Sequence, residues 1–140
     1  MTVNNNFTKT VDLLHRALDA GAVRDAVHAN NLSNSGVPNF KRSMVNFESE
    51  LKRALDTEKQ KPVLELSVTH PGHIPNWKPR DYQEVQIRRV LDYASVSNNN
   101  GNNVNAEEEF TLALQNQLKY MLLVNATTFE FSQVNMILRG

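Results

Sequence analysis

Two histidines three residues apart, His70 and His73, are the side chains of this sequence best placed to hold a metal ion. Zinc requires a third or fourth ligand presented on a rigid frame. The chain has no cysteine and no CxxC or HExxH spacing, and the other histidines, His15 and His28, are distant in sequence. The pair also falls in the proline-rich stretch 69–79. We therefore favour a structural loop, with a small metal-dependent enzyme as an alternative.

Other chemical motifs are missing. No GxSxG, Walker A or GxGxxG pattern occurs, so we expect no enzyme activity and no cofactor. Fifteen Lys+Arg balance fifteen Asp+Glu, and this zero formal charge argues against nucleic acid and anionic lipid as partners. No apolar run approaches the roughly 20 residues that span a bilayer, and no cleavable signal peptide is recognisable. We expect a soluble chain that does not span a membrane.

The length of 140 residues corresponds to one domain, and its prolines all lie between positions 38 and 79. Both ends are therefore free to be helical, whereas the middle is not. Apolar residues at spacings of 4, 3 and 4 predict an N-terminal helix from about 7 to 33; they are Phe7, Val11, Leu14 and Leu18. An Asn/Ser cluster with Gly36 and Pro38 then predicts a turn.

The central region predicts shorter elements. An amphipathic pattern indicates a helix near 44–59. Alternating apolar and polar residues predict two short strands, one over 64–68 and one over 84–88. The asparagine-rich stretch 98–105 has the composition of a flexible loop.

The last segment carries the clearest helical pattern. Asn105, followed three residues later by Glu108, is a variant of the capping box, so we expect a helix to begin at Ala106 and to run to about residue 138. Such a helix is roughly 50 Å long, whereas a compact globule of this length is roughly 37 Å across. The stretch 120–124 is also apolar on all sides. One partner helix cannot cover it.

These patterns predict a mainly α fold: long terminal helices pairing as a coiled-coil-like hairpin, a short third helix, and a small irregular or β central segment. We divide this single elongated unit into 1–33, 34–60, 61–105 and 106–140. The alternative is that the apolar stripes form an ordinary monomeric core. We favour burial of the remaining apolar surface by other subunits. The predicted assembly residues are Val11, Leu14, Leu18, Phe110, Leu114, Leu118, Tyr120, Met121, Leu122, Val124, Phe131 and Leu138.

Residues 29–42 read Ala-Asn-Asn-Leu-Ser-Asn-Ser-Gly-Val-Pro-Asn-Phe-Lys-Arg. This stretch resembles the signature of the flagellar axial proteins, typically Ala-Asn-Asn-Ile-Ala-Asn-Ala-Asn-Thr-Pro-Gly-Tyr-Lys-Arg. It departs at Val37 and Asn39, where Thr and Gly are usual. Since Asn tolerates the left-handed conformation, the turn can be preserved. The predicted turn residues are Asn30, Asn31, Asn34, Pro38, Asn39 and Phe40, for which we favour helix capping plus a contact by Phe40 over a direct role of the asparagines in subunit contacts.

Residues 116–120, 137–140 and 69–75 are similar to the corresponding stretches of proximal rod proteins within this family. The related rod protein FlgC, of similar length, is the nearest alternative. The resemblance implies a structural subunit of the bacterial flagellar basal body, exported by the flagellar type III apparatus without a cleaved signal. It implies polymerisation through the terminal helices into the periplasmic rod, the driveshaft that transmits torque.

The partners implied are other copies of the chain, the rod proteins FlgC, FlgF and FlgG, the adaptor FliE and the flagellar export gate. A soluble helical adaptor or export chaperone, binding partner helices through the same stripes, is the second hypothesis.

Overall fold

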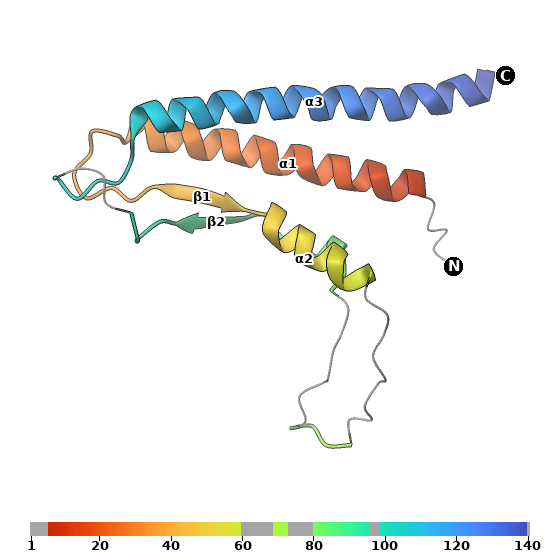
Figure 1. The fold of residues 1–140 in the computed structure, drawn as a ribbon, viewed down its shortest axis with the longest axis horizontal. Coiled ribbons are helices and arrows are strands. Elements are labelled where there is room, and N and C mark those ends of the chain that lie inside the picture. The colour runs from red at the N-terminus through yellow and green to blue at the C-terminus, as the bar shows by residue number, and fades with distance from the viewer. Residues whose placement is uncertain (1–5, 60–68, 73–79, 96–98, 140) are drawn as a thin grey trace. The chain divides into compact units, whose positions relative to one another are not determined.

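The computed structural model describes residues 6–59, 69–72, 80–95 and 99–139. Along the chain its elements are α1 (Asn6–Ser33), β1 (Ser43–Asn46), α2 (Glu48–Lys59), the 3-10 turn η1 (Tyr82–Glu84), β2 (Arg88–Leu91) and α3 (Ala106–Arg139) (Figure 1). The chain forms two compact units. The first comprises residues 1–45 and 89–140, and the second comprises residues 46–88.

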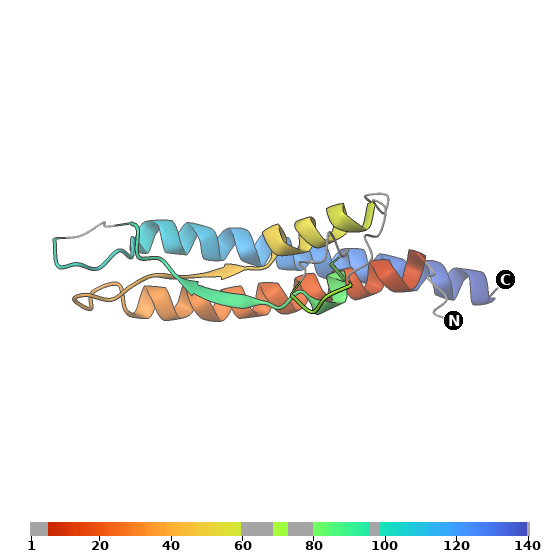
Figure 2. The ribbon, with the colours of Figure 1, turned by 90° about the horizontal axis from the view of Figure 1, so that it is seen from below.

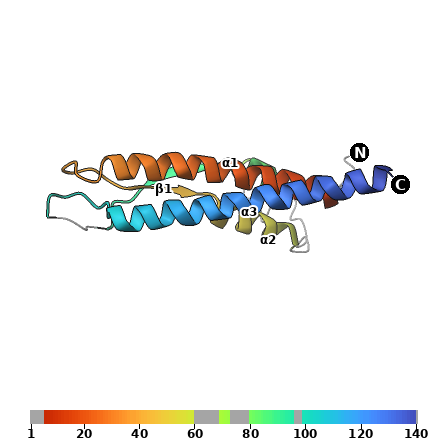
Figure 3. The ribbon, with the colours of Figure 1, turned by 90° about the horizontal axis from the view of Figure 1, so that it is seen from above.

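The two long helices dominate the first unit. They run in opposite directions and lie side by side in all three views (Figure 1, Figure 2 and Figure 3). Residues far apart in sequence are in contact between the two helices. The rings of Phe7 and Phe131 meet edge to face, with centroids 6.2 Å apart. The mainly α fold and the predicted pairing of terminal helices are confirmed. The described helices do not combine the length and apolarity needed to cross a bilayer.

The start of α3 follows its sequence pattern. The side-chain oxygen of Asn105 accepts hydrogen bonds from the backbone N–H groups of Glu107 (3.1 Å) and Glu108 (3.4 Å). These bonds satisfy donors that have no partner within the helix. The three glutamates of the first turn place negative charge where the helix dipole favours it. The predicted N-terminus at Ala106 is confirmed.

Two of the central expectations need correction. The helix predicted to begin near residue 44 begins at Glu48, because residues 43–46 form β1 instead. β1 and β2 pair as a two-stranded sheet and run in opposite directions (Figure 1). The backbone N–H of Asp92 continues the pairing by donating to the carbonyl of Arg42 at 2.8 Å. Pairing with β2 therefore makes residues 43–46 a strand rather than the first turn of a helix.

The strand predicted over 84–88 is displaced to Arg88–Leu91. η1 takes only the first residue of the predicted strand, Glu84, and residues 85–87 form no regular element. Asp81 caps η1 by accepting from the backbone N–H of Gln83 at 2.9 Å, so a local capping interaction holds the chain just before the predicted strand. The other predicted strand, 64–68, lies outside the described residues.

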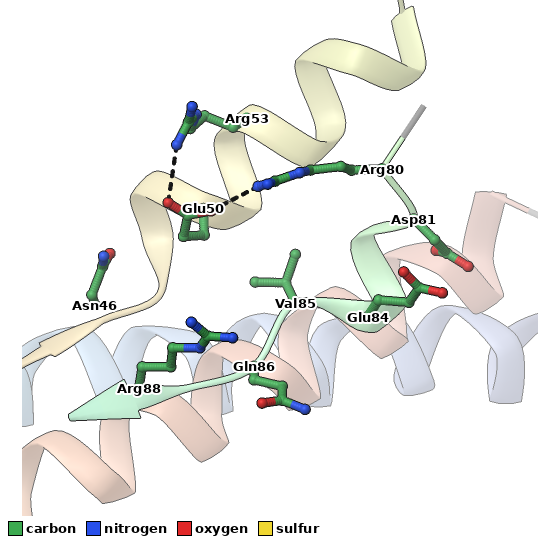
Figure 4. Close-up of a pocket in the computed structure, with 9 residues that line it drawn as sticks. All are labelled: Asn46, Glu50, Arg53, Arg80, Asp81, Glu84, Val85, Gln86 and Arg88. Carbon is green, nitrogen blue, oxygen red and sulfur yellow. Dashed lines mark hydrogen bonds and ion pairs between the residues drawn. The ribbon is translucent and has the colours of Figure 1, made fainter. Parts of the chain in front are cut away.

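The second unit contains α2 and η1. Ala54 is fully buried, and Phe47 is 1% exposed. The hydroxyl of Thr57 accepts from the backbone N–H of Arg80 at 3.2 Å, which ties the chain before η1 to α2. Figure 4 shows the polar pocket of this unit, of about 440 Å³. Its side chains pair with one another, since Glu50 accepts from both Arg53 (3.2 Å) and Arg80 (3.0 Å).

Candidate functional site: the signature turn and the outer face of α3

Asn31, in the last turn of α1, is the most deeply buried residue of the signature. It is 0% exposed. Its amide nitrogen donates to the carbonyl of Ser43 at 2.8 Å, and its side-chain oxygen accepts from the backbone N–H of Ser43 at 3.0 Å. The side chain therefore pairs with the start of β1 as a neighbouring strand would. Its role is structural, as the capping interpretation of the signature anticipates, but its partners lie beyond the helix end.

The carboxylate of Glu109 is the centre of a buried polar cluster formed by Glu109, His28, Asn31 and Arg42. The Glu109 side chain is 1% exposed. It contacts His28 Nδ1 at 2.7 Å, accepts from the amide of Asn31 at 3.2 Å, and forms an ion pair with Arg42 Nε. Because an ionised carboxylate can only accept, Nδ1 of His28 carries the proton in this bond. One side chain of α3 thereby holds two residues of α1 and one of the signature.

The pKa of Glu109 reflects two opposed effects. Burial by itself raises the pKa of this carboxyl, but the hydrogen bonds from His28, Asn31 and Arg42, with the charge of Arg42, outweigh burial and lower the pKa below its ordinary value of 4.5. The carboxylate is therefore ionised at neutral pH. A buried charge of this kind is tolerated because it is fully paired and hydrogen-bonded.

The asparagine-rich segment is ordered by its own amides over residues 99–105, contrary to the expectation of a flexible loop. The side-chain amide of Asn102 is buried, and it donates to the carbonyls of Asn34 (3.0 Å), Ser35 (2.9 Å) and Val37 (2.8 Å). Asn103 accepts from the backbone N–H of Arg42 at 2.6 Å. The asparagines satisfy carbonyls and amides of the turn, which composition alone does not reveal.

The turn itself contains the left-handed residue predicted for it. Asn39 has φ of 61°, and its backbone N–H donates to the carbonyl of Asn100 at 3.0 Å. Lys41 extends the same contact, since its ammonium donates to the carbonyl of Gly101 at 2.8 Å. Asn39 thus takes the place of the usual glycine without losing the conformation.

The remaining signature residues lie nearer the surface. Asn30 is exposed and accepts from Arg89 at 3.0 Å. Asn34 is half-buried and donates to the carbonyl of Asn30 at 2.7 Å. Pro38 is exposed and Phe40 is half-buried. The Asn34 amide thus satisfies a carbonyl in the last turn of α1. The roles predicted for the signature asparagines and for Phe40 stay predictions.

A second buried amide joins the two helices one heptad further along α3. Asn116 donates to the carbonyl of Gly21 (2.9 Å) and to a carboxylate oxygen of Asp25 (2.6 Å). Its oxygen accepts from Arg24 at 3.3 Å. The helices approach closely here, since a Cβ on Gly21 would lie 3.1 Å from the ring of Tyr120. A side chain at position 21 would therefore require the ring of Tyr120 to shift by a few tenths of an ångström.

The predicted assembly residues fall into two groups. Val11, Leu14, Leu18 and Tyr120 are half-buried, while the others are exposed. Among the exposed side chains on α3, Phe131 also meets Phe7 of α1. The others, which we call the outer stripe, are Phe110, Leu114, Leu118, Met121, Leu122, Val124 and Leu138. Their exposure ranges from 41% at Val124 to 77% at Leu138. The face of α3 toward α1 instead carries Glu109 and Asn116.

Sequence reasoning missed Glu109, Asn116 and Asn102 as structural residues. It treated the first as part of an acidic helix start and the last as part of a loop. A usable signal was the heptad spacing of Glu109 and Asn116, which matches that of Gly21 and His28 on α1. The spacing of apolar residues alone does not reveal this polar pair.

The metal hypothesis gains no support. The described residues contain no group of three His, Cys, Asp or Glu side chains placed to hold an ion. The ring nitrogen of His70 accepts from the backbone N–H of Gly72 at 3.1 Å, while His73 lies outside the described residues.

The chain is similar over nearly its whole length to several proteins that share one name. No protein-family model matches the chain. A protein of Borreliella burgdorferi named flagellar basal body rod protein FlgB is 40% identical over 135 residues, which is 96% of this chain and 99% of that protein. Proteins of the same name from Borrelia hermsii and Bacillus subtilis are 39% and 29% identical, each over 96% of this chain and over 99% and 96% of their own lengths.

Proposed function

Because the chain belongs to the FlgB family of flagellar basal body rod proteins, we propose that it polymerises through α1 and α3 as a subunit of the proximal rod. In this proposal the outer stripe of one subunit packs against helices of its neighbours, and the interlocked helices transmit torque. The rod is a structural part of the basal body, and we propose no catalytic role for the chain.

The exposed outer stripe is the observation that supports polymerisation. Large apolar side chains follow one another along α3 at helical spacing, with Phe110 at 63% exposure, Leu118 at 57% and Leu138 at 77%. Contiguous apolar surface of this extent is unusual on a monomer and marks an interaction site. Burying a side chain of this size contributes about 1.5–3 kcal/mol. Several such residues in one stripe can therefore stabilise a helical assembly.

Export and the choice of partners rest on family membership. We propose that the flagellar type III apparatus exports the chain without cleavage, and that it meets FliE, the export gate and the rod proteins FlgC, FlgF and FlgG in the periplasm. The separate second unit, residues 46–88, is a candidate for distinguishing among these partners, because most of the exposed residues of α2 are charged.

The test of polymerisation is a charge placed in the outer stripe. Leu118→Asp should leave the fold of the isolated chain unchanged, since the side chain is exposed, but should abolish rod formation by burying an unpaired charge in the assembly. The readout is motility and recovery of rods from cells that carry only the variant. Gln117→Asp, the adjacent exposed position, is the matched control and should assemble. Normal rods from Leu118→Asp would contradict the proposal.

A second measurement separates the rod subunit from the adaptor hypothesis. In the isolated chain we expect hydrogen exchange to be fast toward Asn6 and Arg139 and slow around Glu109. That pattern fits helices completed by other subunits. Protection along both helices in a discrete, stable dimer would instead favour an adaptor.

A further inference from the structure

The face of α3 that packs on α1 is not its most apolar face. Along the first four turns the outer stripe has Phe110, Leu114, Leu118 and Met121, all between 50% and 63% exposed. The inner face has Glu109 and Asn116 at 1% and 3% exposure. A rule based on hydrophobic burial alone would place the outer stripe inside. Another property of the helix must decide its orientation.

The inner polar groups have partners only in the observed orientation. Glu109 is held by three side chains, and Asn116 bonds to Gly21, Arg24 and Asp25 of α1. Turning α3 by one residue, about 100°, would bring Phe110 toward α1 and carry Glu109 away from Arg42. His28 would then lose its acceptor, and Asn31 would keep only the Ser43 carbonyl. Arg42 would lose Glu109, the closer of its two carboxylate partners, and keep only Glu108. Unpaired buried polar groups of this kind are strongly unfavourable.

The two polar residues also fix the axial position. Glu109 and Asn116 are seven residues apart, and so are His28 and Gly21, the residues that they meet on α1. A buried polar residue that selects one register at some expense of stability is well known in coiled coils. Here the selection concerns a helix pair within one chain.

We propose that Glu109 and Asn116 are specificity determinants that select which face of α3 packs on α1, and thereby keep the outer stripe directed away from it. The selection of the face stands on the geometry of the isolated chain. Only its purpose, the presentation of the outer stripe to other subunits, rests on the proposed function.

A swap that preserves composition tests the proposal. In the variant Glu109→Phe/Phe110→Glu/Asn116→Gln/Gln117→Asn, each polar determinant moves by one position and nothing is added or removed. If the polar groups select the face, α3 turns so that the glutamate at 110 meets Arg42 again. Met121 should then be protected by α1, and Leu123, half-buried in the native chain, should become exposed.

Because the chain has no native cysteine, a single introduced cysteine can report the exposure of one position. Met121→Cys and Leu123→Cys are introduced singly, in the native and swapped chains, and their alkylation rates by iodoacetamide are measured by mass spectrometry. In the native chain Cys at 121 should react roughly tenfold faster than Cys at 123, and in the swapped chain the order should reverse. The control swap Gln117→Leu/Leu118→Gln exchanges two exposed residues and should leave the native order unchanged.

Three results would overturn the proposal: an unchanged order in a swapped chain that remains helical, a rate ratio near one in the native chain, and loss of the helical circular dichroism signal on swapping. The last counts against it because the turned helix should recover every polar partner and bury more apolar surface. Rates are measured at a concentration where sedimentation shows a monomer. Failure of rod assembly therefore cannot be mistaken for failure of face selection.

Discussion

The two ends of the α1–α3 pair differ in the kind of side chain that they bury and expose. Near the signature turn, polar side chains from distant parts of the chain are buried and mutually satisfied, with Glu109 and Asn102 at 1% and 0% exposure. At the far end the contact includes the edge-to-face pair Phe7 and Phe131. Beyond it, Met136, Ile137 and Leu138 are 74–79% exposed. The polar groups of one end are satisfied within the chain, whereas the other end leaves apolar side chains exposed.

This contrast separates stability from assembly. Hydrogen bonds and ion pairs are directional, so the signature end can take only one arrangement. Apolar side chains impose much less geometry, so the far end can accept a neighbouring helix without first breaking a specific bond. Substitutions at the two ends should therefore have different consequences, and the following experiments are ordered by the expected size of their effect on folding.

Removal of the central carboxylate should have the largest effect. Glu109→Ala leaves the buried His28 without its acceptor and leaves Arg42 only the more distant Glu108 at 3.7 Å. The free energy of unfolding should fall by about 3–5 kcal/mol. Urea denaturation followed by circular dichroism measures the change. The control is Glu107→Ala, at an exposed position two residues earlier in α3. It should change stability by less than about 0.5 kcal/mol. Similar values for both variants would remove the distinction between the two ends.

Acid should weaken the signature end selectively. The pKa of Glu109 is lowered in the folded chain, so its contribution to stability is present above the unfolded pKa of about 4.3. That contribution is lost as pH falls from there through the lower folded pKa. Denaturation midpoints measured across this pH range should fall more steeply for the native chain than for Glu109→Gln, which cannot titrate. Parallel pH profiles would show that another group is responsible.

Loss of the Asn102 amide should have an intermediate effect. Asn102→Ala removes the donor to three carbonyls of the turn, two of which keep a backbone donor. Each lost hydrogen bond costs about 0.5–1.5 kcal/mol. Asn99→Ala, at an exposed position of the same segment, should be close to neutral. Equal effects of the two substitutions on the urea midpoint would mean that the segment contributes through composition and not through this one amide.

Substitutions of the left-handed turn residue Asn39 should have smaller effects on stability, which differ between alanine and glycine. At φ of 61°, alanine at position 39 is disfavoured by roughly 1 kcal/mol. Glycine adopts this conformation freely. We therefore expect Asn39→Ala to lower the thermal midpoint and Asn39→Gly to leave it nearly unchanged. A lower midpoint in both variants would point to the Asn39 side chain rather than to its backbone conformation.

The smallest change in folding is expected at the far end. Ile137→Ser alters a side chain that is 79% exposed and should shift the unfolding free energy by less than about 0.5 kcal/mol. Incorporation into rods, by contrast, should be impaired if the exposed end is covered by partners. Asn135→Ser, an exposed polar position on the same helix, is the control. Unimpaired incorporation of Ile137→Ser would confine the assembly surface to the earlier turns of α3.

The sequence allowed the helices to be predicted more reliably than the contacts between them. Apolar spacing and the cap at Asn105 located α1 and α3 to within a residue or two, because these signals are local. The same spacing could not identify the inner face of α3. Its middle is apolar on all sides, and the orientation depends on partners as distant as His28 and Arg42.

The turn was likewise predictable in its local conformation but not in its distant contacts. The left-handed conformation of Asn39 followed from its residue type and its place in the signature. The order of the asparagine-rich segment did not, because the carbonyls that Asn102 satisfies lie more than sixty positions earlier in the chain. The strand β2 was misplaced for a related reason, since its partner β1 was read as part of a helix.

The buried polar cluster also bears on the order of events during folding. Its bonds to Glu109 span 67, 78 and 81 positions of sequence. Contacts of such separation form late, because the intervening chain must first be brought together at an entropic cost. In the export that we propose, α1 and the signature would leave the channel before residue 109. The cluster would then close only after most of the chain had passed.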